Sequence, residues 1–271
     1  MRWPIVIGCV MVVLASGPAI EAQWLNYPSR GIPRLPDGKP DLSAPPPRTA
    51  DGKPDLSGIW QLEPDNPCPA LGCQVDYRAA REFINLGAKL PGGLPYRPAA
   101  AALVKERTEQ LGKDDPVGFC KPGGAVRILT FPPYRKILQI PDLVVILSER
   151  DVTYRQLFLD GRPLPEDPSP TFNGYSTGRW EGDTLVIQTN GLRGGTWLDR
   201  NGSPISEAAK MTERFRRVNV GLLEIELTID DPGEYTKPWT VTLRQRLVVD
   251  TELLDYHCTD NERSAPHMVG K

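Results

Sequence analysis

The sequence predicts a mainly β protein: an antiparallel meander closed into a lipocalin-like barrel, with one or two short helices and an extended proline-rich N-terminal arm. Three observations lead to this prediction. Proline and glycine account for 29 and 25 of the 271 residues, and both disfavour helix interiors. From about residue 125 onward, apolar and polar side chains alternate with a period of two. The connections between the alternating runs are mostly short enough for hairpins.

The first 22 residues, 1–22, have the order of a secretory signal peptide. Arg2 provides a positive charge, residues 5–14 are almost purely apolar, and small residues lead to Ala22. A membrane anchor is the alternative, but the apolar run is much shorter than the ~20 residues that span a bilayer. We therefore expect cleavage after Ala22, which leaves 249 residues (271 minus 22), and a secreted or periplasmic location.

Residues 23–58 are expected to form the extended arm, because prolines recur throughout them. The heptapeptide DGKPDLS occurs at 37–43 and again at 51–57. Each copy predicts an Asp-Gly turn followed by an extended step. Two copies are too few for a solenoid, so we interpret them as a duplicated linker. The second copy runs into Gly58-Ile59-Trp60, which can add a strand to the main domain.

Residues 59–113 are expected to be a helical and loop segment packed on the barrel. Apolar residues at helical spacing predict helices over 78–86 and 97–111. Pro98 suits a first helical turn, and Gly87 and Gly112 are natural stops.

Residues 114–258 are expected to form the antiparallel β domain, followed by a tail over 259–271. A two-sheet sandwich is the alternative to a barrel, since both architectures limit the exposure of unpaired edge strands. The longer connections, 161–174 and 190–210, could fold over one mouth of the barrel. Alternation predicts strands at 126–131, 136–140, 143–149, 154–160, 175–180, 184–189, 211–218, 222–229, 239–249 and 253–257.

Four cysteines remain after the signal, which carries Cys9 away. An even number in an oxidising compartment predicts disulfides. Three pairings are possible, and we favour Cys68 with Cys73, which can close locally, and Cys120 with Cys258. A zinc site that includes His257 is the alternative, but the paired knuckles typical of structural zinc are missing, so we predict no metal.

Charge and motif content exclude several classes of function. The net charge is −2 with no basic block, which argues against nucleic acid as a partner. No second hydrophobic run is long enough to span a membrane in the mature chain. The G-x-S-x-G, H-E-x-x-H, P-loop and G-x-G-x-x-G motifs do not occur, so no cofactor is predicted. The oligomeric state is left open.

Aromatic, arginine and carboxylate side chains gather between residues 160 and 214. We expect Trp180 and Trp197 to stack on a ligand at the mouth between the two long loops, with Arg179, Asp183 and Asp199 as hydrogen-bonding groups. Arg179 and Trp180 are neighbours in a strand and point to opposite faces, and we expect Trp180 inside. Alternatively, the tryptophans cap the core and the charges pair at the rim.

Catalysis would have to use carboxylates. The candidate pool is Asp183, Asp199, Glu207 and Glu213. Glycosidase chemistry needs two carboxyl groups roughly 5–9.5 Å apart across the bond that breaks.

Distinctive motifs recur along the mature chain: DGKPDLSGIW at 51–60, FCKPGG at 119–124, YRQLFLDGR at 154–162, GRWEGDTLV at 178–186, TWLD at 196–199, TERF at 212–215, IDDP at 229–232 and YTKPW at 235–239. Together these motifs resemble those of a large group of exported, functionally uncharacterised bacterial proteins. The likeness covers most of the mature chain and implies a shared fold and export, without an activity.

Three functions remain in competition. The first is an exported barrel that binds a small, partly apolar ligand. The second is a carboxylate-dependent hydrolase, lyase or isomerase that acts on an extracellular sugar or lactone. The third is an envelope interaction module without a small-molecule site. The shape of the barrel interior should discriminate among them.

Overall fold

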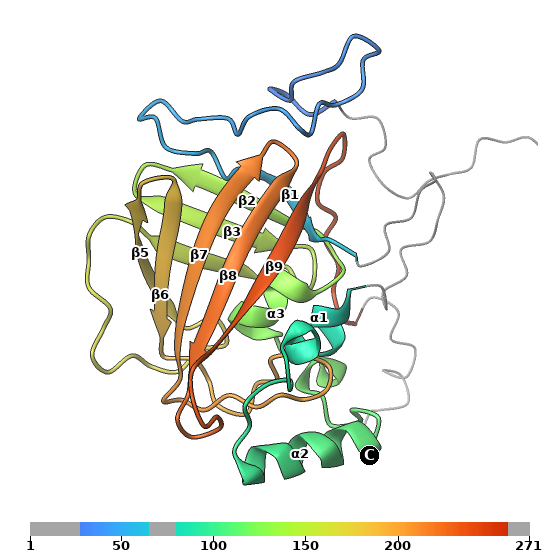
Figure 1. The fold of residues 1–271 in the computed structure, drawn as a ribbon, viewed down its shortest axis with the longest axis vertical. Helices are drawn as coiled ribbons and strands as arrows, with labels where there is room; N and C mark the ends of the chain where they lie inside the picture. The colour runs from blue at the N-terminus through green and yellow to red at the C-terminus, as the bar shows by residue number, and fades with distance from the viewer. Residues whose placement is uncertain (1–27, 65–79, 260–271) are drawn as a thin grey trace, which may run out of the picture.

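A closed barrel of nine strands forms the body of the molecule, which confirms the predicted fold class (Figure 1). The computed structural model describes residues 28–64 and 80–259. Each strand is hydrogen-bonded to its neighbours in chain order, and the last pairs with the first. The strands are β1 Gly58–Leu62, β2 Arg135–Ile140, β3 Leu143–Ser148, β4 Tyr154–Phe158, β5 Tyr175–Glu181, β6 Thr184–Asn190, β7 Lys210–Asn219, β8 Leu222–Asp230 and β9 Trp239–Val248.

One strand pair departs from the predicted antiparallel order. β4 and β5 are parallel and share two residue pairs, Leu157 with Ser176 and Phe158 with Thr177. The intervening segment 161–174 returns along the barrel instead of turning back as a hairpin. A long connection permits a parallel pairing that a short turn cannot make.

β1 closes the barrel, although most of it lies in the segment expected to pack outside. It pairs with β2 on one side and β9 on the other. Trp60 is completely buried in the main core, and its indole donates a hydrogen bond to the carbonyl of Leu56. The strand expected from Gly58-Ile59-Trp60 is thus present, and it joins the β domain.

Two of the ten expected strands are not strands. Residues 126–131 fall mostly within helix α3, Gly124–Thr130, whose seven residues are all buried. A short apolar run that is buried all round has no polar face, so its period cannot distinguish a strand from a helix. Residues 253–257 contribute only a single bridge, between Tyr256 and Arg150.

Helices gather at one end of the barrel (Figure 1). The expected helix 78–86 is a short helix α1, Arg81–Ile84, followed by a 3-10 turn η1, Leu86–Lys89. The expected helix 97–111 is α2, Pro98–Glu109, with Pro98 in its first turn. A second 3-10 turn, η2, spans Pro116–Phe119. Arg135, which is completely buried, donates hydrogen bonds to the carbonyls of Leu129 and Phe131 and thereby ties the end of α3 to the barrel.

Side chains fill the barrel. The main core contains residues from β1 to β4 and from β6 to β9, together with four residues of α3. A charged pair lies among them: Arg155 of β4 donates hydrogen bonds to both carboxylate oxygens of Glu213 on β7. The same guanidinium bonds the hydroxyls of Ser176 and Thr189. The interior is therefore a packed core that holds a hydrogen-bonded ion pair, in which Arg155 Nε alone of the guanidinium nitrogens has no partner among the described residues.

The arm covers the end of the barrel opposite the helices (Figure 1). Both copies of the repeat form the same small hairpin: Arg34 bonds the carbonyl of Gly38, and Arg48 bonds that of Gly52. Each arginine also pairs with a carboxylate of the barrel rim, Asp250 for Arg34 and Asp183 for Arg48. The two copies are thus similar hairpins, each held to the barrel rim by an arginine, whereas the sequence suggested a linker.

Cys120 and Cys258 form a disulfide across 138 residues, as predicted. The bridge joins the segment before α3 to the last residues that the structure describes. The signal peptide and the pair Cys68 and Cys73 lie outside the described residues. Within the described ranges, no helix has the length and apolar character needed to cross a membrane.

Candidate functional site

Three residues of the expected mouth lie at the β5–β6 hairpin. Trp180 is partly buried and packs against the main core, whereas Arg179 is exposed and pairs with Glu181. The expected orientation, with the indole inside and the guanidinium outside, is thus the one observed. Asp183 is exposed at the turn, and the Arg48 guanidinium holds the pKa of its carboxyl below the usual value.

The other two residues lie in the loop after β6 and are buried. Trp197 is 3% exposed, and the guanidinium of Arg107 lies 4.6 Å from its ring centroid. Asp199 accepts hydrogen bonds from the amide of Leu86 and from the amide and hydroxyl of Ser203. Burial raises the pKa of Asp199, and the hydrogen bonds from Ser203 oppose that shift. Asp199 therefore fastens this loop to η1.

These five residues do not converge on one site. The β5–β6 turn and the loop that contains Trp197 lie at opposite ends of β6, a strand of seven residues. A strand of that length spans about 20 Å, since each residue advances ~3.3 Å. The long loop 161–174 runs back along the barrel, and its last residues, which precede β5, lie at the far end from Asp183.

The candidate carboxylates also occupy separate environments. Asp183 belongs to an exposed ion pair, Asp199 is a buried hydrogen-bond acceptor, Glu213 pairs with Arg155 inside the barrel, and Glu207 is exposed. The described part of the chain contains no group of three or more residues that could hold a metal ion.

Asp199 is linked through Ser203 to a phenol with a high pKa. The Tyr96 hydroxyl lies 2.7 Å from Ser203 Oγ. Burial raises the pKa of Tyr96 from its ordinary value of 10.0 to about 12. The native phenol holds its proton more tightly than the unfolded one, so this group's contribution to stability is lost as pH rises through that range.

When the pH rises from about 9 to about 11, the free energy of unfolding should therefore fall less in Tyr96→Phe than in the wild type, because the titrating phenol is absent from the variant. Urea denaturation at the two pH values measures the difference. Tyr154→Phe is the control, since Tyr154 is 61% exposed. An equal loss in all three proteins would show that Tyr96 titrates normally.

A cleft of about 660 Å³ opens beside α3, at the helical end of the barrel. We call it the α3 cleft. Seven separate stretches of the chain line it: Gln61 of β1, Phe83 of α1, residues 111–118 around η2, residues 127–134 from α3 to the start of β2, residues 149–150, Arg200 and residues 254–256. Its aromatic lining consists of Phe83, Phe131, Tyr134 and Tyr256, and its charged lining of Asp115, Arg127, Glu149, Arg150, Arg200 and Asp255.

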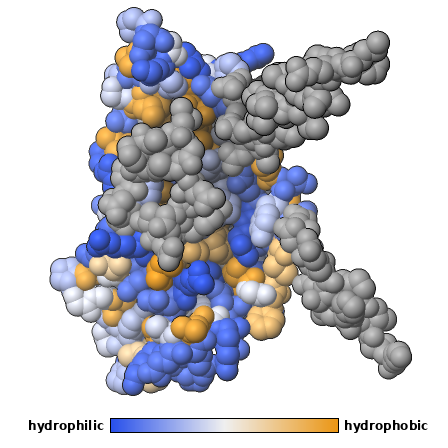
Figure 2. All heavy atoms as spheres, turned by 90° about the vertical axis from the view of Figure 1, so that its right-hand side faces the viewer, coloured by the Kyte–Doolittle hydropathy of each residue, from blue (hydrophilic) through white to orange (hydrophobic). Residues whose placement is uncertain are grey.

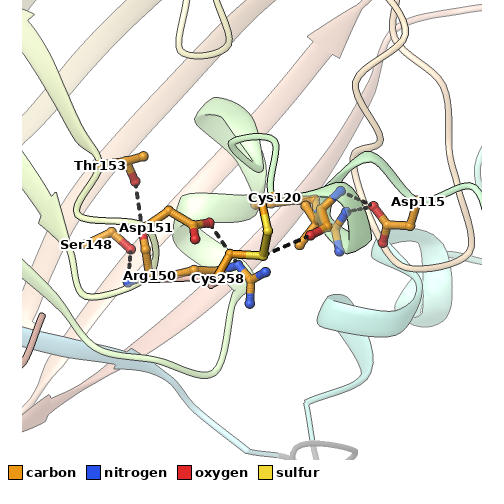
Figure 3. A network of polar contacts seen from close by, with 9 residues as sticks. Asp115, Cys120, Ser148, Arg150, Asp151, Thr153 and Cys258 are labelled. Atoms are coloured by element: carbon orange, nitrogen blue, oxygen red, sulfur yellow. Dashed lines mark hydrogen bonds and ion pairs between the residues drawn. A yellow bond between two sulfur atoms is a disulfide. The ribbon is translucent and has the colours of Figure 1, made fainter. Parts of the chain in front are cut away.

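Two arginines meet over one aromatic ring in the α3 cleft. The guanidinium carbons of Arg127 and Arg150 lie 4.7 and 4.8 Å from the ring centroid of Phe131. Arg127 donates a hydrogen bond of 2.7 Å to Asp115, and Arg150 forms an ion pair of 3.2 Å with Asp151. Figure 3 shows these acids on either side of the disulfide. Each cation is held by one carboxylate and by stacking, so both are fixed in place.

The disulfide joins two walls of the α3 cleft. Val117 and Gly118 line it just before Cys120, and Leu254 to Tyr256 line it just before Cys258. Figure 2, which views the molecule from the right-hand side of Figure 1, shows hydrophobic and hydrophilic residues interspersed over the coloured part of that face. Sequence reasoning missed the site because its residues are scattered along the chain. The one available signal was the predicted Cys120–Cys258 bridge, which brings two of the walls together.

No protein-family model matches this chain, and no relative is found among curated proteins. The fold itself defines the class: a closed nine-strand barrel with a filled interior, an arm across one end and helices across the other. A cleft lined by aromatic and charged side chains accompanies the helices.

Proposed function

We propose that this protein binds a small, partly apolar molecule in the α3 cleft. The observation that carries the proposal is the size of the cleft, about 660 Å³, together with its mixed lining. Binding sites for small molecules typically enclose ~300–1,000 Å³ and combine apolar walls with a few fixed polar groups. Because side chains fill the barrel, the ligand meets the barrel at its end and not in its interior.

The lining suggests the chemistry of that ligand. Phe83 and Phe131 supply apolar contact, and Arg127 supplies a fixed hydrogen-bond donor. Arg150, whose side chain is 18% exposed, adds a second guanidinium to the same lining. Guanidinium groups form charge-assisted hydrogen bonds with anionic acceptors. The favoured ligand therefore has an aromatic or aliphatic body and one acceptor group, such as a carboxylate or sulfonate.

We propose export for the same protein. The order of residues 1–22, the disulfide between Cys120 and Cys258 and the resemblance to exported bacterial proteins support it.

A variant that fills the α3 cleft tests the binding proposal. Gly118 lines the cleft, and a Cβ added there meets no atom within 4 Å. Gly118→Trp should therefore fold and place an indole in the cleft. Anilinonaphthalene sulfonate, which has an aromatic body and one acidic group, is the probe. We expect at least about tenfold weaker binding to the variant, a loss of about 1.4 kcal/mol.

The matched control is Phe119→Trp. It places an indole on the next residue of the same turn, which is 64% exposed and does not line the cleft. Both variants must unfold cooperatively in urea near the wild-type midpoint, because partly unfolded proteins also bind this dye. Equal dye binding by the wild type and both variants would contradict the proposal.

A further inference from the structure

A second cavity lies beside the shortest pairing between neighbouring strands of the barrel. β4 and β5 share two residue pairs, whereas every other neighbouring pair of strands shares at least three. A groove of about 510 Å³ lies beside that contact, bounded by residues 152–156 and 171–176. We call it the seam groove. No residue lines both this groove and the α3 cleft.

Aromatic and amide side chains face the seam groove from β4. Alternate residues of this strand, Tyr154, Gln156 and Phe158, point outward, while Arg155 and Leu157 are buried. Tyr154 is 61% exposed. The ring of Phe158 stacks on that of Tyr175, with centroids 5.2 Å apart. The groove thus has an aromatic side chain at each end of a row, with an amide between them.

The lining of the seam groove includes one charged residue, Arg155, and Glu213 neutralises its guanidinium inside the barrel. The remaining polar groups are amides and hydroxyls, including those of Gln156, Asn173 and Thr153. Such groups both donate and accept hydrogen bonds, as the hydroxyls of a neutral ligand do.

An added β-strand does not suit this groove. A peptide strand that paired with β4 would need backbone N–H and C=O groups of β4 that have no other hydrogen-bond partner. The side-chain amide of Asn173 already donates a hydrogen bond of 2.8 Å to the carbonyl of Tyr154. The ligand must therefore be recognised through side chains.

We propose that the seam groove binds a neutral oligosaccharide. The C–H groups on the face of a sugar ring pack against the negative face of an aromatic ring, here Tyr154. The hydroxyls of the sugar donate hydrogen bonds to, and accept them from, side-chain amides beside that ring, here those of Gln156 and Asn173. This site is separate from the α3 cleft, and neither proposal depends on the other.

Titration calorimetry of the mature protein tests the site with cellotetraose and maltotetraose as neutral probes and tetragalacturonate as an acidic one. At least one neutral sugar should bind, and Tyr154→Ala should weaken its binding about tenfold. Phe119→Ala truncates an aromatic residue of similar exposure outside the groove and should leave binding unchanged. Gly118→Trp, which fills only the α3 cleft, should also leave it unchanged.

Three results would overturn the proposal. The first is that neither neutral sugar binds. The second is that sugar binding survives Tyr154→Ala but is lost in Gly118→Trp, which would move the site to the α3 cleft. The third is that tetragalacturonate, or an extended Ser-Thr-rich hexapeptide, binds the groove more tightly than both neutral sugars.

Discussion

Replacing Glu213 by Ala should lower the free energy of unfolding by about 3–5 kcal/mol, because it leaves the buried Arg155 charge without its partner. The side chains of Arg155 and Glu213 are 1% and 0% exposed. Four hydrogen bonds converge on this guanidinium, two from it to Glu213 and one each to Ser176 and Thr189. Urea denaturation followed by far-ultraviolet circular dichroism measures the change.

Two further variants serve as controls for Glu213→Ala. Arg155→Met combined with Glu213→Leu removes both charges and should recover most of the lost stability. The hydroxyls of Ser176 and Thr189 keep a partner in that variant, since they lie 2.9 Å from each other. Glu226→Ala, on the exposed face of β8, should change stability by less than about 0.5 kcal/mol. If Glu213→Ala behaves like Glu226→Ala, the pair is not the buried centre that we describe.

Removal of the Cys120–Cys258 disulfide is the second change with a large expected effect. The bridge closes a loop of 138 residues. In the chain-entropy model a loop of that length gives about 5 kcal/mol of stabilisation. The double variant Cys120→Ser and Cys258→Ser should lose an amount of that order in urea denaturation. A reductant is a poorer test, since it would reach every cysteine of the chain.

The same variant should loosen the α3 cleft, because the bridge joins two of its walls. We expect weaker binding of anilinonaphthalene sulfonate to the folded double variant than to the wild type. Sugar binding in the seam groove should be unaffected. An unchanged denaturation midpoint would mean that the two chain segments are held together by packing alone.

The sequence by itself determined the local features of this protein. Strict alternation along β8 and β9 predicted strands with one apolar face, and the structure buries Leu223, Ile225 and Leu227 on that face. Trp180 faces the core and Arg179 faces the solvent, as their neighbouring positions in a strand require. These predictions succeeded because they depend on periods of a few residues.

Only the tertiary structure decided what depends on distant segments. Residues 126–131 are apolar enough for a strand, and they form α3 because the end of the barrel surrounds them with core. The direction of β5 follows from the path of 161–174, which no local pattern encodes.

The site was decided in the same way. Trp180 and Trp197 are close in sequence, yet the length of β6 separates them. The α3 cleft instead joins Phe83, Arg127, Arg150 and Tyr256, which lie far apart along the chain. A local pattern specifies which way a side chain points relative to its own backbone. Which side chains meet is set by how the elements pack, and that depends on the whole chain.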